Sequence, residues 1–323
     1  MYGLDGTGSF HIIFFRNGTC CSLSDYFYSQ NLTIMKLSSC ILTLAAILFS
    51  CQGSQPSGST MGSEIVYLPR DREIVEETLA RFPETAKSEK GPLMVKVARS
   101  FLETPYVANT LEVADSEKLV VNLREMDCTT FAENCLALVR TLQQKNPGFE
   151  SFTAELEKIR YREGIRNGYP SRLHYFSDWI HDNDQKGIVK SVSQEIAHIL
   201  LPNQVNFMST HSQQYPVLKS HPELIPQIVL QEYSITNRKA WYIPRNKLPD
   251  YESELQDGDI VGITTSIEGL DVVHVVIVWR MNGKVRFIHA SSKENRVVVS
   301  KETLAEYLKG SKMATGIMVA RPL

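Results

Sequence analysis

Residues 271–290 constrain the fold more than any other stretch, because they have the pattern of one long β-hairpin. The segment 271–280, DVVHVVIVWR, is rich in β-branched side chains, which favour extended strands. Asn282-Gly283 supplies the dipeptide that is typical of a two-residue hairpin turn, and residues 284–290 form the returning strand. We therefore expect an antiparallel sheet in which Met281 pairs with Lys284.

Two histidines share one face of this hairpin. In the expected register His289 lies opposite Val276, which makes His274 its diagonal neighbour. Diagonal neighbours have backbones about 7–8 Å apart, within reach of two imidazole rings. A lone histidine in an apolar strand is more often a packed core residue. Two on one face favour a base, His274, that forms a thiolate–imidazolium pair and is oriented by the second ring of His289.

A candidate nucleophile lies far upstream, at the start of a predicted helix. Residues 129–140 place Phe131, Cys135 and Leu138 on one apolar face, at spacings of a helix. Cys128 comes immediately before this segment, where the helix dipole and the unpaired N–H groups favour a thiolate. Cys135 fits the role of a small buried hydrophobic residue.

The positions of the cysteines indicate that Cys128 forms no disulfide with Cys135. The chain contains six cysteines, at positions 20, 21, 40, 51, 128 and 135. Seven residues along a helix correspond to about 10.5 Å, which is beyond the reach of a disulfide of about 7 Å between Cα atoms. Cys128 and Cys135 are therefore expected to stay unpaired, even in an oxidising compartment.

The N-terminal sequence has the pattern of an export signal. Met35-Lys36 precedes a short apolar run that ends in Leu48-Phe49-Ser50-Cys51, which resembles the lipobox of bacterial lipoproteins. A plain signal peptide is the alternative. The expected organisation is an upstream mis-start at 1–34, a lipoprotein signal peptide at 35–50, a flexible tether at 51–63 that begins with lipidated Cys51, and a single domain at 64–323.

Composition narrows the classes of partner. The chain has 323 residues, of which 43% are hydrophobic and 22% charged, and its formal net charge is −2. These values are ordinary for a soluble globular protein and give no electrostatic basis for binding nucleic acid. Neither a dinucleotide-binding nor a P-loop pattern occurs, so no nucleotide and no cofactor are expected. H-E-x-x-H is absent as well. His174 with Asp178 is the best pair for a metal, and no metal site is predicted.

The combined motifs resemble a known family of cell-wall hydrolases. The residues that carry the resemblance are Tyr106 in LETPYV, Asp127-Cys128-Thr129, the GDIV segment 258–261, His274 in HVVI, and His289-Ala290. Their order is that of NlpC/P60 peptidoglycan hydrolases. The segments 160–164 and 169–180 are similar to one branch, the N-acetylmuramoyl-L-alanine amidase-like family, also called domain of unknown function 1460.

This resemblance implies an α+β fold with a papain-like NlpC/P60 core, in which the nucleophile helix packs on an antiparallel sheet. It also implies a triad of Cys128, His274 and His289, with Tyr106 lining the cleft. Asp127 matches the residue that helps to bind a substrate amine. Thr129, a further candidate for substrate binding, stands where the superfamily usually has serine.

The 146 positions between Cys128 and His274 exceed what a minimal domain of that superfamily needs. We expect an insertion at about 145–250 that shapes the cleft, with helices at 151–163 and 191–201. Four of its side chains are candidates to hold sugar or peptide, although structural roles are more common for such residues: Arg172, His174, Tyr175 and Trp179.

The sequence thus predicts a cysteine amidase or peptidase, lipid-anchored in a bacterial cell envelope, that acts on peptidoglycan through an acyl-enzyme. The family name implies the N-acetylmuramoyl–L-alanine amide as the bond cleaved. The wider superfamily implies the bond between D-glutamate and a diamino acid. Two other classes stay open: an acyltransferase with the same triad, and a non-catalytic envelope-binding lipoprotein.

Overall fold

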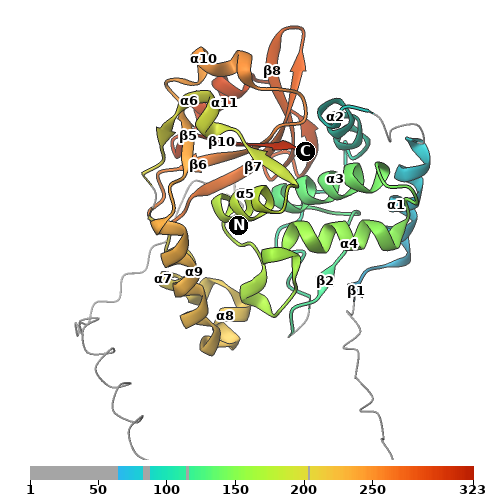
Figure 1. Cartoon of the computed structure of the whole chain (residues 1–323), viewed down its shortest axis with the longest axis horizontal. Coiled ribbons are helices and arrows are strands. Elements are labelled where there is room, and N and C mark those ends of the chain that lie inside the picture. Colours follow the sequence, from blue (N-terminus) through green and yellow to red (C-terminus); the bar gives the residue numbers. More distant parts are fainter. Residues whose placement is uncertain (1–64, 83–87, 114–115, 203) are drawn as a thin grey trace, which may run out of the picture. The chain divides into compact units, whose positions relative to one another are not determined.

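A computed structural model describes residues 65–82, 88–113, 116–202 and 204–323, all of which belong to one structural unit (Figure 1). The expected mis-start, signal peptide, tether and lipidated Cys51 lie outside these described residues. Among the described residues, no helix has both the length and the apolar character that crossing a membrane requires.

The first half of the described chain is mainly helical. Its elements are β1 (Ile65–Val66), α1 (Pro69–Arg81), α2 (Lys90–Ser100), β2 (Leu119–Val120), α3 (Cys128–Leu142) and α4 (Phe149–Arg160). β1 and β2 pair in parallel as a small separate sheet. The helix predicted at 129–140 is confirmed by α3, whose side chains are buried along almost its whole length. Such all-round burial identifies α3 as the central helix of the core.

The second half builds one antiparallel sheet. Its strands are β3 (Val189–Ser191), β4 (Ile199–Leu200), β5 (Trp241–Pro244), β6 (Ile260–Thr265), β7 (Val272–Met281), β8 (Lys284–Ser291), β9 (Arg296–Val299) and β10 (Ala314–Pro322). Within the described residues the order is β4-β5-β10-β6-β7-β8-β9, and β3 pairs with β10. The α+β class is thus confirmed.

The hairpin register is confirmed. Met281 pairs with Lys284, and Ile277 pairs with Ile288. Asn282 and Gly283 have φ angles of 52° and 76°, which are the positive values that a two-residue turn matching the strand twist requires. The sequence of the turn therefore sets which side chains of β7 and β8 share a face.

The two faces of the sheet pack on different helices. Val275 and Ile277 belong to the core cluster that contains the apolar side of α3. Val276 and Val278 belong to a second cluster, together with α11 (Leu304–Gly310). Because successive side chains of a strand point to opposite faces, this alternation places the sheet between α3 and α11.

The segment 145–250 is largely built into the main fold. Its remaining helices are α5 (Phe176–Gln185), α6 (Ser193–Ala197), α7 (Phe207–Thr210), α8 (Pro216–Ser220), α9 (Ile225–Asn237) and α10 (Leu248–Tyr251). Short 3-10 turns join them: η2 (Arg162–Gly164), η3 (Tyr169–Ser171), η4 (Ser212–Gln214) and η5 (Pro222–Leu224), with η6 (Glu252–Glu254) after α10. α4 and α5 contribute to the α3 core, and β3 and β5 extend the sheet. Only the part around α7–α9 packs as a core of its own.

Two of the predicted helix boundaries need correction. The helix expected at 151–163 is α4, which ends at Arg160 before the turn η2. The helix expected at 191–201 is wrong, because α6 covers only Ser193–Ala197 and β4 follows. His198 ends α6 with a left-handed conformation, φ 47°, and the chain then extends to pair with β5.

Candidate active site

Cys128 is the first residue of α3, and Asp127 caps the helix. Asp127 Oδ1 accepts hydrogen bonds from the backbone N–H groups of Thr129 at 3.0 Å and Thr130 at 2.8 Å. The Thr130 hydroxyl adds a bond of 2.9 Å to the same oxygen. A carboxylate is the preferred cap for such orphan donors, so the sequence Asp-Cys-Thr-Thr fixes where the helix and its first side chain begin.

Burial makes Cys128 a neutral thiol in this structure. Its side chain is almost fully enclosed, and burial together with the negative charge of Asp127 raises its pKa to about 12. Hydrogen bonds from the Val275 backbone and the Thr129 side chain act in the opposite direction but are smaller. The expected resting thiolate is therefore corrected: desolvation outweighs the favourable field of the helix start.

The two histidines contact each other directly. His274 Nε2 and His289 Nδ1 lie 2.6 Å apart, and the ring planes are close to perpendicular. Burial lowers the pKa of His274 to about 4, and burial with the neighbouring His274 lowers that of His289 to about 2. Both rings are neutral near pH 7. With Nε2 engaged by His289, Nδ1 is the nitrogen through which His274 can serve another group.

The backbone of β7 passes beside the thiol of Cys128. Val275, which hydrogen-bonds Cys128, directly follows His274 in the strand. Three neutral groups can then act in sequence. The Cys128 thiol donates a proton, His274 accepts at Nδ1 and donates at Nε2, and His289 accepts at Nδ1. This arrangement is capable of general-base activation of a nucleophile.

Tyr106 lies beside the start of α3, as the resemblance implied. Its backbone N–H donates to Asn295 O at 3.0 Å, and Tyr106 forms an isolated parallel bridge with Met126. Burial raises the pKa of its hydroxyl, with further contributions from the charges of Cys128 and Asp127. The phenol is half-buried, and its expected role in lining a cleft stays a prediction.

Tyr307 of α11 is a site residue that the sequence did not reveal. Its ring centroid lies 6.4 Å from that of His274 and 6.2 Å from that of His289. It also meets Phe287 edge-on at 5.2 Å. Burial raises the pKa of its hydroxyl, and the charge of Cys128 adds to this shift. A single tyrosine on a seven-residue helix carries no pattern, so only the packing of α11 against the hairpin could identify it.

The side chains of Arg172 and His174 both contact other groups of the protein. Arg172 donates through Nε and Nη2 to Glu117 and through Nη1 to Glu112, at 2.6–3.0 Å. His174 Nε2 lies 2.9 Å from the carbonyl oxygen of Tyr169, and burial beside Arg172 lowers its pKa to about 3. These contacts brace the segment after α4. Arg172 also lines a pocket of about 200 Å³, and a role of either side chain toward substrate stays a prediction.

Tyr175 and Trp179 are also structural in their placement. The Tyr175 hydroxyl donates to Glu232 at 2.7 Å and accepts from the Met208 backbone at 2.8 Å, which ties α5 to α7 and α9. Trp179 is 1% exposed and stacks on Phe176 at 5.0 Å. Their aromatic rings therefore build the core in place of a sugar-binding surface.

Within the described part of the chain, no three His, Cys, Asp or Glu side chains are grouped to hold a metal ion. Asp178, the candidate metal partner of His174, forms ion pairs with Arg162 and Arg238. His174 itself faces a backbone carbonyl.

Comparison with known proteins identifies similar families and folds. The pattern of the N-acetylmuramoyl-L-alanine amidase-like family matches residues 96–317. A solved structure from Bacteroides uniformis, described as an N-acetylmuramoyl-L-alanine amidase, has 38% identity and a TM-score of 0.70 over 72% of this chain and 99% of its own. No curated protein matches.

Two further structures are similar. One from Bacteroides fragilis, described as a candidate xylanase, has 40% identity and a TM-score of 0.67 over 70% of this chain and 99% of its own. One from Legionella pneumophila, assigned to domain of unknown function 1460, has 19% identity and a TM-score of 0.58 over 78% of this chain and 95% of its own. The last likeness concerns the fold alone.

Proposed function

The chain belongs to the N-acetylmuramoyl-L-alanine amidase-like family, and on this premise we propose that Cys128 attacks an amide bond of peptidoglycan. Two observations support the proposal: the hydrogen bond of the helix-borne thiol with the backbone of Val275, which follows His274 in β7, and the 2.6 Å contact between His274 and His289. The neighbour from Bacteroides uniformis is described as an amidase, which supports the class of bond.

The reaction follows from the neutral state of the three groups. His274 Nδ1 takes the proton of the Cys128 thiol as sulfur attacks the carbonyl carbon. The resulting imidazolium is stabilised by the hydrogen bond to His289, and it then donates its proton to the leaving amine. An acyl-enzyme forms, and water, deprotonated by His274, releases the acid and restores the thiol. The backbone N–H of Cys128 at the helix start is the proposed oxyanion donor.

The bond cleaved is proposed to be the N-acetylmuramoyl–L-alanine amide, on the strength of the family match. The alternative is the amide between D-glutamate and a diamino acid. Mass spectrometry of the products from purified peptidoglycan separates them. Free glycan with an intact peptide supports the first bond, and a divided peptide supports the second.

The mechanism is tested by removing the thiol. Cys128→Ala should release no fragments while the thermal unfolding midpoint stays close to that of the parent protein. Cys135→Ala is the matched control, because Cys135 is also a buried free thiol on α3 and should leave release intact. Full activity of Cys128→Ala would sink the mechanism.

Experiments on the same protein distinguish hydrolysis from acyl transfer and from simple binding. A transferase gives a product heavier than the hydrolysis fragment. A binding module has no reason to couple Cys128 to His274, so its thiol alkylation would be insensitive to His274→Ala, whereas a hydrolase should show slower alkylation in that variant. A glycosidase, the activity named for the Bacteroides fragilis neighbour, requires two carboxyl groups across the scissile bond. The groups that shift the pKa of Cys128 include one carboxylate, Asp127, which is engaged as a helix cap.

We further propose that the protein acts in a bacterial cell envelope, anchored by a lipid on Cys51. The support is the sequence pattern at 35–51. Expression in a Gram-negative host should place the protein in the membrane fraction, and Cys51→Ala should move it to the soluble fraction. An unchanged distribution would contradict the anchor.

A further inference from the structure

The outward side of α9 exposes three large apolar side chains, which we call the α9 patch. Val229, Leu230 and Tyr233 are 46%, 69% and 70% exposed. Tyr233 follows Val229 by four residues and Leu230 by three, so all three lie on one side of the helix. The exposed residues of α9 carry no charge, because Glu232, its one charged residue, is buried. Exposed apolar groups gathered in this way mark an interaction surface.

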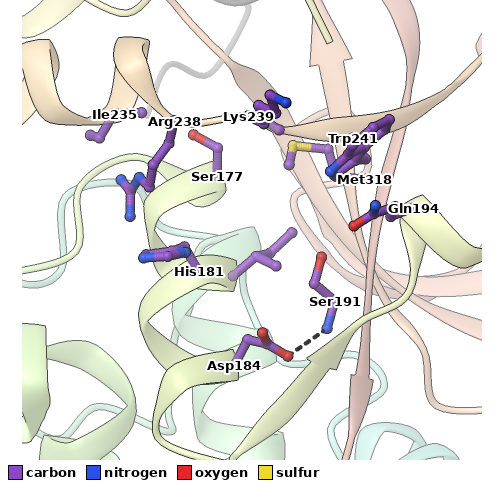
Figure 2. A pocket seen from close by; sticks show the side chains of 12 residues that line it. Ser177, His181, Asp184, Ser191, Gln194, Ile235, Arg238, Lys239, Trp241 and Met318 are labelled. Atoms are coloured by element: carbon purple, nitrogen blue, oxygen red, sulfur yellow. Dashed lines mark hydrogen bonds between the residues drawn. The ribbon is translucent and has the colours of Figure 1, made fainter. Parts of the chain in front are cut away.

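The opposite side of α9 packs against the protein. Ile228 and Ile235 belong to the core cluster of the α7–α9 region, and seven residues bring a helix back to the same side after two turns. Figure 2 shows Ile235 beside Ser177 of α5, at a pocket of about 220 Å³. A surface helix is normally apolar toward the core and polar toward water. Because α9 is apolar on both sides, its outer side has the character of a second contact surface.

The charges that flank α9 leave this surface nearly neutral. Before the helix, Glu223 lies 3.0 Å from His221 Nδ1. After it, Arg238 pairs with the buried Asp178 at 2.5 Å. Lys239 follows and is exposed, and an ammonium group in that place matches the phosphate of a lipid headgroup. An apolar helix side bordered by a cation is the pattern of helices that lie at a bilayer surface.

The size of the α9 patch argues against a second copy of the chain as its occupant. α9 has 13 residues. A helix of this length is about 20 Å long and about 10 Å wide, so one side of it offers about 200 Å². Stable protein–protein interfaces bury about 800 Å² on each partner. A bilayer has no such minimum, provided that something else keeps the protein close to it.

The proposed lipid on Cys51 supplies that proximity. Residues 52–64 separate Cys51 from β1, and a chain of this length spans at most about 45 Å. A domain of about 260 residues has a radius of gyration of about 18 Å. Each face of the domain can therefore reach the bilayer that holds the anchor, and the high effective concentration makes even a weak contact favourable.

The arrangement of the elements within this structural unit suits such a contact. In Figure 1, β1 and α9 both lie toward the lower edge of the view, and α11 lies at the upper edge. Tyr307 of α11 contacts both proposed catalytic histidines. A bilayer at the lower edge therefore meets the α9 patch near the side where the anchored chain enters, and it leaves the α11 end free.

We propose that the α9 patch docks on the phospholipid bilayer that holds the lipid anchor. The inference rests on the proposed lipidation of Cys51, which is the reason that a bilayer is nearby. Docking converts a loose attachment into one orientation, in which α9 faces the lipid and the α11 end faces away from it, toward the cell wall.

The test holds the full chain on a bilayer without using the anchor. Cys51→Ala protein with an N-terminal hexahistidine tag is bound to phosphatidylcholine vesicles through a nickel-chelating lipid. Tyr233→Trp places a fluorescent probe in the α9 patch. Brominated acyl chains should quench about half of the added emission, because a docked apolar helix side lies about 5–10 Å below the headgroup surface. Adding Leu230→Glu, which brings a carboxylate into the patch, should abolish the quenching.

Two controls are matched to these changes. Met313→Trp places the same probe at a residue that is 37% exposed and follows α11, so bromine should not quench it. Leu323→Glu charges another exposed leucine, 44% exposed and outside α9, and should leave the quenching of Tyr233→Trp intact. Absence of quenching at Tyr233→Trp, or equal quenching at Met313→Trp, would overturn the docking.

The docking and the anchor fail separately. If Tyr233→Trp is quenched while Cys51→Ala leaves the protein in the membrane fraction of cells, the docking stands and the anchor is wrong. If Cys51→Ala releases the protein but bromine does not quench Tyr233→Trp, the anchor stands and the docking is wrong. A dimer in analytical ultracentrifugation that Leu230→Glu dissociates would assign the α9 patch to a second copy and contradict the bilayer.

Discussion

The protonation states of single residues decide how the site begins its reaction. The sequence placed Cys128 at a helix start, where a thiolate is favoured, but it gave no measure of burial. The enclosed thiol and the two buried imidazoles are instead all neutral near pH 7. In the proposed mechanism, proton transfer therefore accompanies the attack on substrate. We expect thiol alkylation of the free protein to rise with pH well above the range in which an exposed cysteine titrates.

The buried histidines predict how stability depends on pH. Above pH 6.5 both rings are neutral in the folded and the unfolded chain. As pH falls below 6.5 the unfolded chain binds protons at both, whereas the folded chain resists down to about pH 4 at His274 and about pH 2 at His289. The free energy of unfolding should therefore fall by at most about 1.4 kcal/mol per pH unit for each ring.

Urea unfolding at pH 7 and pH 5 measures this loss. His289→Gln should show a smaller decrease between the two values than the parent protein. His221→Gln is the control, since His221 is exposed in a surface pair with Glu223. Equal pH slopes in the parent and His289→Gln would contradict the assignment.

A second prediction for a single residue concerns the hydroxyl group of Tyr307. Tyr307→Phe keeps the ring contacts with Phe287 and both histidines but removes a hydroxyl near the thiol. We expect kcat/KM to fall by about tenfold to a hundredfold, because donors near a developing oxyanion have effects of this order or larger. The unfolding midpoint should hardly change. Tyr233→Phe, at a residue 70% exposed on α9, provides the comparison, and matching activities of the two variants would remove Tyr307 from the site.

At the scale of elements, the N-terminus of α3 combines a structural and an electrostatic role in one carboxylate. Asp127→Asn retains an acceptor for the cap but removes the charge that raises the pKa of Cys128. Alkylation of the thiol at fixed pH should become about threefold faster, because a lower pKa of Cys128 leaves a larger fraction of thiolate. Stability should change little.

Asp127→Ala separates the two roles, because it removes both the cap and the charge. It should lower the free energy of unfolding by about 1 kcal/mol. Asp250→Asn, an exposed change on α10, is the control for alkylation. An unchanged alkylation rate in Asp127→Asn would show that the charge does not act on the thiol.

Element by element, sequence patterns succeeded where the signal is local. The Asn282-Gly283 turn has one strongly favoured geometry, and it sets the register that makes His274 and His289 diagonal neighbours on one face. The apolar periodicity of residues 129–140 likewise predicted α3, which begins with the proposed nucleophile. The helix predicted at 191–201 was wrong because its apolar pattern covers few residues. The left-handed conformation of His198 depends on the pairing of β4 with β5. Long-range pairing of this kind leaves no local pattern.

At the scale of the whole molecule, the segment 145–250 was harder to predict than the start of α3 or the β7–β8 hairpin. Arg172 and Tyr175 have the chemistry of ligand-binding residues, and only their partners, Glu117 and Glu232, reveal structural roles. These partners lie 55 and 57 positions away in the chain. The motif order predicted the family and the position of Cys128, but the contacts that carry α5 into the core depend on the complete fold.

A buried ion pair links α3, the helix that begins with Cys128, to α4 and β2. Arg160 at the end of α4 donates through Nε to Glu133 of α3 at 2.7 Å and through Nη1 to Val120 O of β2 at 2.6 Å. Both side chains are at most 4% exposed. Removing one partner leaves the other charge buried without compensation. Glu133→Ala should therefore lower the free energy of unfolding by about 3–5 kcal/mol.

The double variant Glu133→Leu, Arg160→Met decides what the pair contributes. An apolar replacement of both partners is often close to neutral, so we expect it to recover most of the stability that Glu133→Ala loses. Glu77→Ala breaks an exposed pair with Arg70 and should have little effect. If the double variant is as unstable as Glu133→Ala, the pair is needed for its specific hydrogen bonds to α4 and β2. In that case the position of Cys128, five residues before Glu133, depends on the ion pair as well as on apolar packing.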